Sequence, residues 1–236
     1  MLLIAVPLAF TICFTLLQMR FEYPDILRQP TAEILTKFRA GGPSLIATWY
    51  ALAFTALLFI PIALLTHRAL AERGATLALW FATTCGVLAG LVQALGFLRW
   101  PFLVPFLADA YLDPAAGESQ RAAAALVFEG FHRYAGMAVG EHLGYLATSL
   151  WTAGVAIVLW RAPQAGRWLG ASGLLLAAGV AAGLLEPAGV ELAGAVNAVS
   201  YLAWSVWLIA LGVRFVLQGR EPAVGPRPAA LPVPTA

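Results

Sequence analysis

Six long apolar runs, separated by shorter segments that hold most of the charged residues, dominate this sequence. A helix needs about 20 mostly apolar residues to cross a hydrocarbon layer of ~30 Å. Leu- and Ala-rich stretches fill the runs, without the ~10-residue alternating segments of a membrane barrel. The pattern therefore predicts an all-α fold, a polytopic integral membrane helical bundle with six transmembrane helices. The expected spans are Leu2–Met19, Ser44–Thr66, Thr76–Phe97, Ala138–Trp160, Trp168–Leu185 and Leu192–Val213.

The two ends of the chain differ from the middle. Leu2–Met19 has no basic segment before it and no small-x-small cleavage site after it, so we interpret it as a retained helix rather than a signal peptide. Residues 217–236 are rich in proline, which predicts an extended, disordered cytoplasmic tail. The sequence thus predicts one six-helix transmembrane domain, residues 1–216, followed by this tail.

Two longer loops are expected on one side of the bundle. In Phe21–Gly42, a short amphipathic helix after Thr31 would place Ile34, Leu35 and Phe38 on one face, either in the membrane interface or as a connector packed on the bundle. The second loop, Arg99–Gln120, is too apolar for a free loop and is broken by prolines. We expect it to form an interfacial or re-entrant cap over the mouth of the bundle.

Charge sets an expected orientation. The chain is 61% hydrophobic and 11% charged, with a mean hydropathy of +0.82 and a net charge of +2. The short loops His67–Ala75 and Arg161–Arg167 are basic, whereas the two longer loops carry most of the acids, so both termini should be cytoplasmic. No basic run resembles a nucleic-acid patch, which argues against nucleic acid as a partner.

A polar stretch, residues 129–144, interrupts the fourth apolar run. One continuous helix from Gln120 to Trp160 would be roughly 60 Å long, so that Glu141 and His142 fall at the membrane rim opposite Trp160. At ~100° per residue these two residues flank opposite sides of a face that carries Gly136, Gly140 and Gly144. Glycines four residues apart favour close helix packing. Further from the membrane lie Glu129, His132 and Arg133, of which Glu129 and Arg133 have the spacing of an ion pair.

Three more polar residues should lie at the same depth, namely Gln93, Glu186 and Asn197. Ionisable groups near a bilayer are costly and tend to face a partner or a cavity. These groups are therefore either ion-paired rim residues that orient the helices or the lining of a vestibule. The candidate ligand-binding residues are Glu141, His142, Glu129, His132, Arg133, Glu186, Gln93 and Asn197.

The sequence favours no cofactor and names no catalytic residue. Glu129-x-x-His132 is half of a di-iron pattern whose second half is missing. His132 and His142 lie on one predicted helix, which disfavours a bis-His haem. A single metal held by Glu141, His142 and Glu186 remains as an alternative. Cys13 and Cys85 fit apolar packing positions.

Several motifs carry a family resemblance. They are Gly140-Glu-His-Leu-Gly-Tyr145, Trp151-Thr152, Arg167-Trp-Leu-Gly170, Leu184-Leu-Glu-Pro187 with Gly189, and Asn197 with Tyr201. Over roughly Phe131–Phe215 the chain resembles the bacterial family of unknown function numbered 4386. The resemblance implies a six-helix bacterial membrane protein and supplies no activity.

The leading hypothesis is a non-enzymatic protein of the bacterial inner membrane. Its polar outer-leaflet cavity would bind a small polar or cationic ligand, for sensing or transport, with membrane lipids as its other partners. A membrane metalloprotein or enzyme that uses Glu141, His142 and Glu186 is one alternative, and a structural membrane subunit is another. The oligomeric state stays open.

Overall fold

Long helices make up almost all of the computed structural model, which describes residues 1–71, 76–161 and 167–218. The predicted tail, residues 217–236, therefore lies almost wholly outside the described residues. In chain order the elements are α1 (Leu2–Phe21), η1 (Asp25–Arg28), α2 (Thr31–Leu57), α3 (Phe59–Ala71), α4 (Leu77–Phe102), α5 (Val104–Leu112), α6 (Glu118–Phe131), η2 (His132–Leu143), α7 (Gly144–Arg161), α8 (Arg167–Ala181), η4 (Ala182–Ala188) and α9 (Ala193–Gln218).

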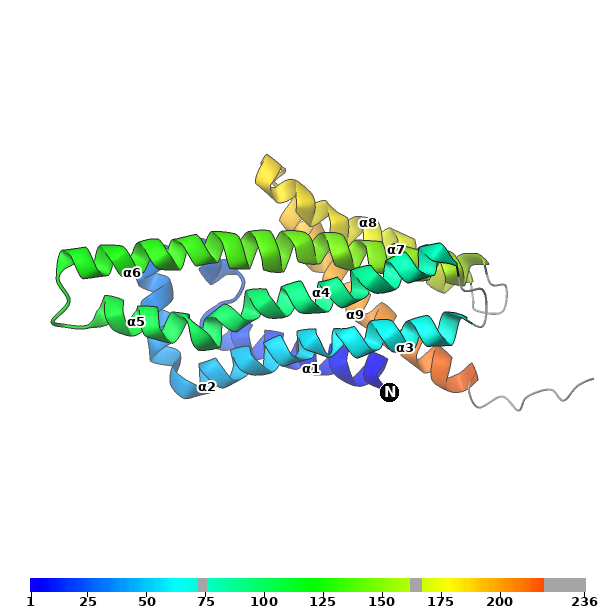
Figure 1. The fold of residues 1–236 in the computed structure, drawn as a ribbon, viewed down its shortest axis with the longest axis horizontal. Coiled ribbons are helices and arrows are strands. Elements are labelled where there is room, and N and C mark those ends of the chain that lie inside the picture. Colours follow the sequence, from blue (N-terminus) through cyan, green and yellow to red (C-terminus); the bar gives the residue numbers. More distant parts are fainter. Residues whose placement is uncertain (72–75, 162–166, 219–236) are drawn as a thin grey trace, which may run out of the picture.

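Within the described residues, these elements give six helical segments long and apolar enough to cross a membrane, as the sequence predicted. Three of them are far longer than a crossing needs, with 41, 36 and 44 residues. Their surplus, namely the first part of α2 with α5 and α6, projects at one end of the bundle together with η1 (Figure 1). We call this the hairpin end. The opposite end, where Met1 and Gln218 lie, is the terminal end.

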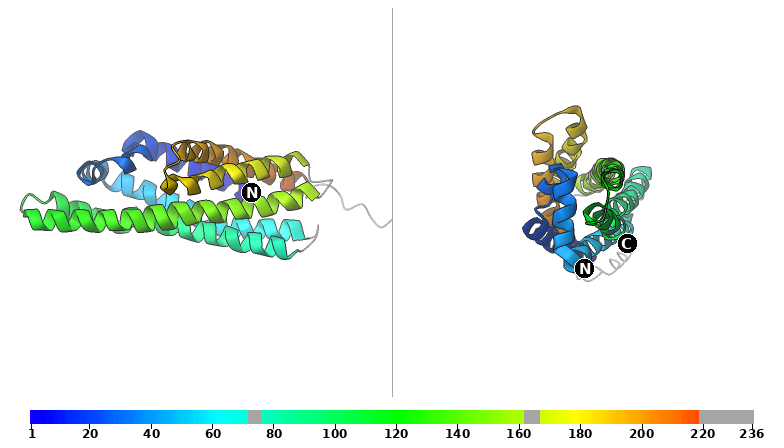
Figure 2. Two further views of the ribbon diagram at one scale, coloured as in Figure 1. Left: turned by 90° about the horizontal axis from the view of Figure 1, so that it is seen from above. Right: turned by 90° about the vertical axis from the view of Figure 1, so that its left-hand side faces the viewer.

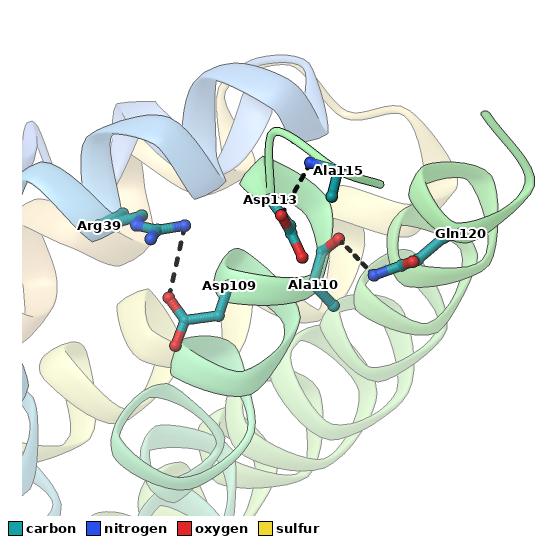
Figure 3. Close-up of polar contacts among 6 residues, drawn as sticks. All are labelled: Arg39, Asp109, Ala110, Asp113, Ala115 and Gln120. Carbon is teal, nitrogen blue, oxygen red and sulfur yellow. Dashed lines mark hydrogen bonds and ion pairs between the residues drawn. The ribbon is translucent and has the colours of Figure 1, made fainter. Parts of the chain in front are cut away.

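The hairpin end replaces the expected cap of Arg99–Gln120, and that prediction was wrong. α4 continues into α5, and α5 turns back into α6 as a helical hairpin (Figure 1). Pro105 lies in the first turn of α5, where the missing N–H costs no helical hydrogen bond. Asp113 caps the turn by accepting a hydrogen bond from the Ala115 amide at 2.8 Å (Figure 3).

The first part of α2 packs on the bundle as a connector. Ile34, Leu35 and Phe38 are buried, as the amphipathic pattern predicted. Gly42, with φ 58° and ψ −156°, bends α2 between this part and the apolar part that follows. In Figure 1 and in the right-hand view of Figure 2, which looks from the hairpin end, the first part of α2 (blue) runs across the bundle rather than along it.

Two separate hydrophobic cores occupy the two ends. The core at the terminal end centres on Phe59, Trp151 and Trp207. The core at the hairpin end is rich in aromatic rings, which we call the aromatic cluster: Phe21, Tyr23, Phe38, Trp49, Phe97 and Trp100.

The fourth span is one continuous helical run, as predicted, but its middle is not α-helical. His132–Leu143 forms a π-helix, η2, between α6 and α7. π-helical segments are frequent at functional sites. Because a π-helix turns less per residue than an α-helix, the predicted angular positions of Glu141 and His142 do not hold. The sequence offered no signal for this change.

Candidate functional site

The centre of the candidate site is Arg99, near the end of α4. Its side chain is buried, at 9% relative exposure, within one of the candidate membrane-crossing segments. Its Nη1 donates a short hydrogen bond to the Gly96 carbonyl. The rest of the guanidinium lies on the backbone of η2, because a Cβ added at Gly136 would come within 2.6 Å of Nη2. Glycine at 136 therefore makes the room for a buried cation.

Glu141, on η2, carries the opposite charge to Arg99, and the two side chains interact electrostatically. The same carboxylate interacts with Glu186 on η4 and with Arg28 on η1. Arg28 is 3.9 Å from Glu186, between Nη2 and Oε2. The structure therefore brings together Glu141 and Glu186, which the sequence had grouped, and adds two arginines.

Three tyrosines lie within electrostatic reach of Glu141, and one of them, Tyr23, is also within reach of Arg99. Burial raises the pKa of Tyr23, in the segment between α1 and η1; Glu141 acts in the same direction and Arg99 opposes it. Tyr145 and Tyr201 pack with their ring centroids 5.8 Å apart, and both interact with Glu141. We call Tyr23, Arg99, Glu141, Tyr145 and Tyr201 the polar cluster.

Gln93 and Asn197 lie next to the polar cluster but are used in helix packing. Gln93 Nε2 donates to Thr148 Oγ1 at 3.1 Å and so joins α4 to α7. Asn197 Nδ2 donates to the Val180 carbonyl at 2.7 Å and joins α9 to α8. Such bonds hold membrane helices together, because lipid supplies no competing polar groups.

The remaining candidates lie at the edge of the site or outside it. Glu129 is exposed and accepts a hydrogen bond from Thr31 at 3.2 Å, and the predicted ion pair with exposed Arg133 is not formed between these described residues. His132 stacks on Phe128 and lies within electrostatic reach of Arg99. His142 is half-buried.

The alternative metal site finds no support in the geometry. Within the described ranges, no three His, Cys, Asp or Glu side chains come together closely enough to hold an ion. Glu141, His142 and Glu186 therefore do not form the three-ligand set that the sequence left open.

Two surface grooves lie outside the polar cluster. One, of about 720 Å³, is lined by Tyr50, Phe54 and Phe102 with small and aliphatic neighbours from α2 and α4. The other, of about 290 Å³, lies on α6 and the start of η2 and includes Phe131 and Tyr134. Both are apolar, so neither is the polar vestibule that the sequence suggested.

Sequence reasoning missed Arg99 and all three tyrosines. Arg99 was assigned to a loop because the apolar run ends at Phe97, whereas the helix continues to Phe102. Tyrosine is neutral at pH 7, so it does not stand out as a charge in an apolar sequence. Tyr145 and Tyr201 both belong to the motifs that carry the family resemblance, and these motifs were the visible signal for them.

The fold and the site define a multi-pass helical membrane protein with a polar cluster around buried Arg99, towards the hairpin end of a mostly apolar bundle. Comparison with known families agrees with this class. A family model described as "Domain of unknown function (DUF4386)" matches residues 1–212, and the chain belongs to this family. No curated protein and no solved structure matches it.

Proposed function

We propose that this protein is a non-enzymatic membrane protein that binds a small polar ligand at the polar cluster and serves as a sensor. The observation that carries the proposal is the burial of Arg99 beside Glu141 inside membrane-crossing helices. Such charges are costly in a membrane, and they usually mark a ligand or ion site.

The asymmetry of the bundle favours sensing over transport. The polar cluster lies towards the hairpin end, whereas the core at the terminal end is apolar. A transporter needs polar lining that can reach both faces, and the terminal half supplies little. If the protein lies in a bacterial inner membrane with both termini in the cytoplasm, the polar cluster lies in the outer leaflet. This orientation rests on the basic short loops.

A co-purification experiment tests the proposal. The protein in mild detergent is examined by native mass spectrometry for a bound small molecule, beside Glu141→Gln and Asp109→Asn. Asp109 is a matched control, because its exposed carboxylate, on α5, pairs with Arg39 at 3.5 Å (Figure 3). We expect the wild type and Asp109→Asn to retain a ligand. In Glu141→Gln the fraction of protein with bound ligand should fall at least about tenfold.

Two results would contradict ligand binding. One is a bound species that Glu141→Gln retains fully. The other is the absence of any bound species, together with no thermal shift by sodium acetate, glycine or tetramethylammonium chloride. Either result would favour the structural-subunit reading, in which the cluster only orients helices.

A further inference from the structure

Three buried N–H groups near the hairpin end have no acceptor among the residues that the structure describes. Trp49 and Trp100 are completely buried, and their indole Nε1 atoms have no hydrogen-bond partner within the described parts of the chain. The Nε of Arg99 is also buried and unpartnered there. Indole and guanidinium groups donate only and cannot accept, so none of the three can satisfy another.

These donors belong to one assembly. The indole rings of Trp49 and Trp100 stack with centroids 4.7 Å apart and an interplanar angle of 11°. The guanidinium carbon of Arg99 is 5.1 Å from the centroid of the Trp100 ring. Tyr23, which feels the charge of Glu141, packs edge-on against Trp49 at 5.0 Å. The donors are therefore contiguous with the polar cluster.

The arrangement departs from the usual behaviour of buried polar groups. More than about 90% of them find a partner in folded proteins, and a buried donor without an acceptor destabilises the fold. The described residues supply no acceptor to these donors, and lipid chains carry none. A molecule that brings oxygen acceptors would remove this cost for the donors that it reaches.

We propose that the stacked pair Trp49–Trp100, with Arg99, binds the carbonyl or carboxylate oxygens of a small molecule. This inference rests on the proposed ligand binding and gives the ligand its chemical class. The site is close to charge-neutral, because Glu141 lies near Arg99. A carbonyl compound or a zwitterion therefore fits better than a multiply charged anion, while a simple cation has no acceptor to offer these donors.

Indole N–H resonances report directly on this site. The full chain, labelled with ¹⁵N-tryptophan in detergent, has eight tryptophans, and the signals of Trp49, Trp100 and Trp207 are assigned by their loss in Trp→Phe variants. Trp207 is the internal control, because its Nε1 already donates to the Leu169 carbonyl at 2.9 Å. The probes are sodium acetate, acetamide and tetramethylammonium chloride.

We expect acetate or acetamide to shift the Trp49 and Trp100 signals saturably towards hydrogen-bonded positions, with Trp207 unmoved and tetramethylammonium without effect. Equal movement of Trp207, movement with tetramethylammonium alone, or no movement would overturn the inference. Signals that already lie at hydrogen-bonded positions and ignore every probe would mean ordered water only, and would overturn it too.

The two proposals can fail separately. A co-purified ligand that is lost in Glu141→Gln but kept in both Trp49→Phe and Trp100→Phe would leave ligand binding intact and remove the tryptophan site. Loss of the ligand in Trp100→Phe but not in Trp207→Phe would support both.

Discussion

The two ends of the bundle differ in the hydrogen bonding of their buried tryptophan side chains. At the terminal end, Trp204 donates its indole hydrogen to Thr152 at 2.8 Å, and Trp207 donates to the Leu169 carbonyl. At the hairpin end, Trp49 and Trp100 are at least as deeply buried but donate to no described residue. These two terminal-end indoles thus donate within the protein, although the buried hydroxyl of Thr66 on α3 has no partner among the described residues. At the hairpin end, the indole donors of Trp49 and Trp100 and the Nε of Arg99 find no acceptor in the described part of the chain.

Replacement of Arg99 should have the largest effect on this contrast. Arg99→Leu removes the bond to the Gly96 carbonyl and the cation that acts on half-buried Glu141. We expect a loss of about 1.5–3 kcal/mol in the free energy of unfolding, the range for a hydrogen bond to a charged group, measured by denaturant titration in detergent.

The double variant Arg99→Leu/Glu141→Gln should recover part of that loss, because the side chain at position 141 then carries no charge for Arg99 to balance. Arg39→Leu is the matched control, since Arg39 is half-exposed and pairs only at the surface. If Arg99→Leu unfolded at the same denaturant concentration as the wild type, the two charges would not be coupled in the protein.

A smaller change in stability is expected when one tryptophan from each end is replaced and the two variants are compared. Trp207→Phe loses the hydrogen bond from the indole to the Leu169 carbonyl, to which Ser172 still donates at 3.3 Å, whereas Trp100→Phe loses ring contacts alone. We expect Trp207→Phe to be the more destabilising by about 1 kcal/mol in ligand-free protein. Thermal melts of the two variants side by side measure the difference. Equal or reversed losses would show that the Trp100 indole does have an acceptor.

The smallest effect belongs to the surface of the hairpin end. Asp109→Asn breaks the exposed contact with Arg39, and we expect a loss of about 0.2–1 kcal/mol that shrinks at high salt. Unfolding at low and high ionic strength measures it. A loss as large as that of Arg99→Leu would mean that α5 is held by this one contact rather than by its buried residues Val104, Leu107 and Ala108.

Much of this fold could be predicted from hydropathy, because long apolar runs are typical of membrane-crossing helices and of few other structures. The hairpin end was harder, since the prolines at 101 and 105 indicated a break, while the structure tolerates them near helix termini. Local spacing could not foresee the π-helix either, because no residue pattern distinguishes it from an α-helix.

The candidate site was also predicted only in part. Glu141 and Glu186 stood out as charges in an apolar setting, and the structure brings them within electrostatic reach of each other. Arg99 and Tyr23 joined them only through tertiary contacts between elements far apart in the chain. Gln93 and Asn197 had the right depth, but their amides are taken up by neighbouring helices.

Gly42 has a consequence for how this sequence can change over generations. Its φ of 58° and ψ of −156° fall in a region that is open essentially to glycine alone. Nothing within 4 Å would block a larger side chain, so the constraint comes from the backbone and not from space. A single missense change there would redirect the first part of α2 and separate Phe38 from Trp100, whose ring centroids now lie 5.7 Å apart. Descendants of this chain should therefore keep glycine at 42 even where the residues around it drift.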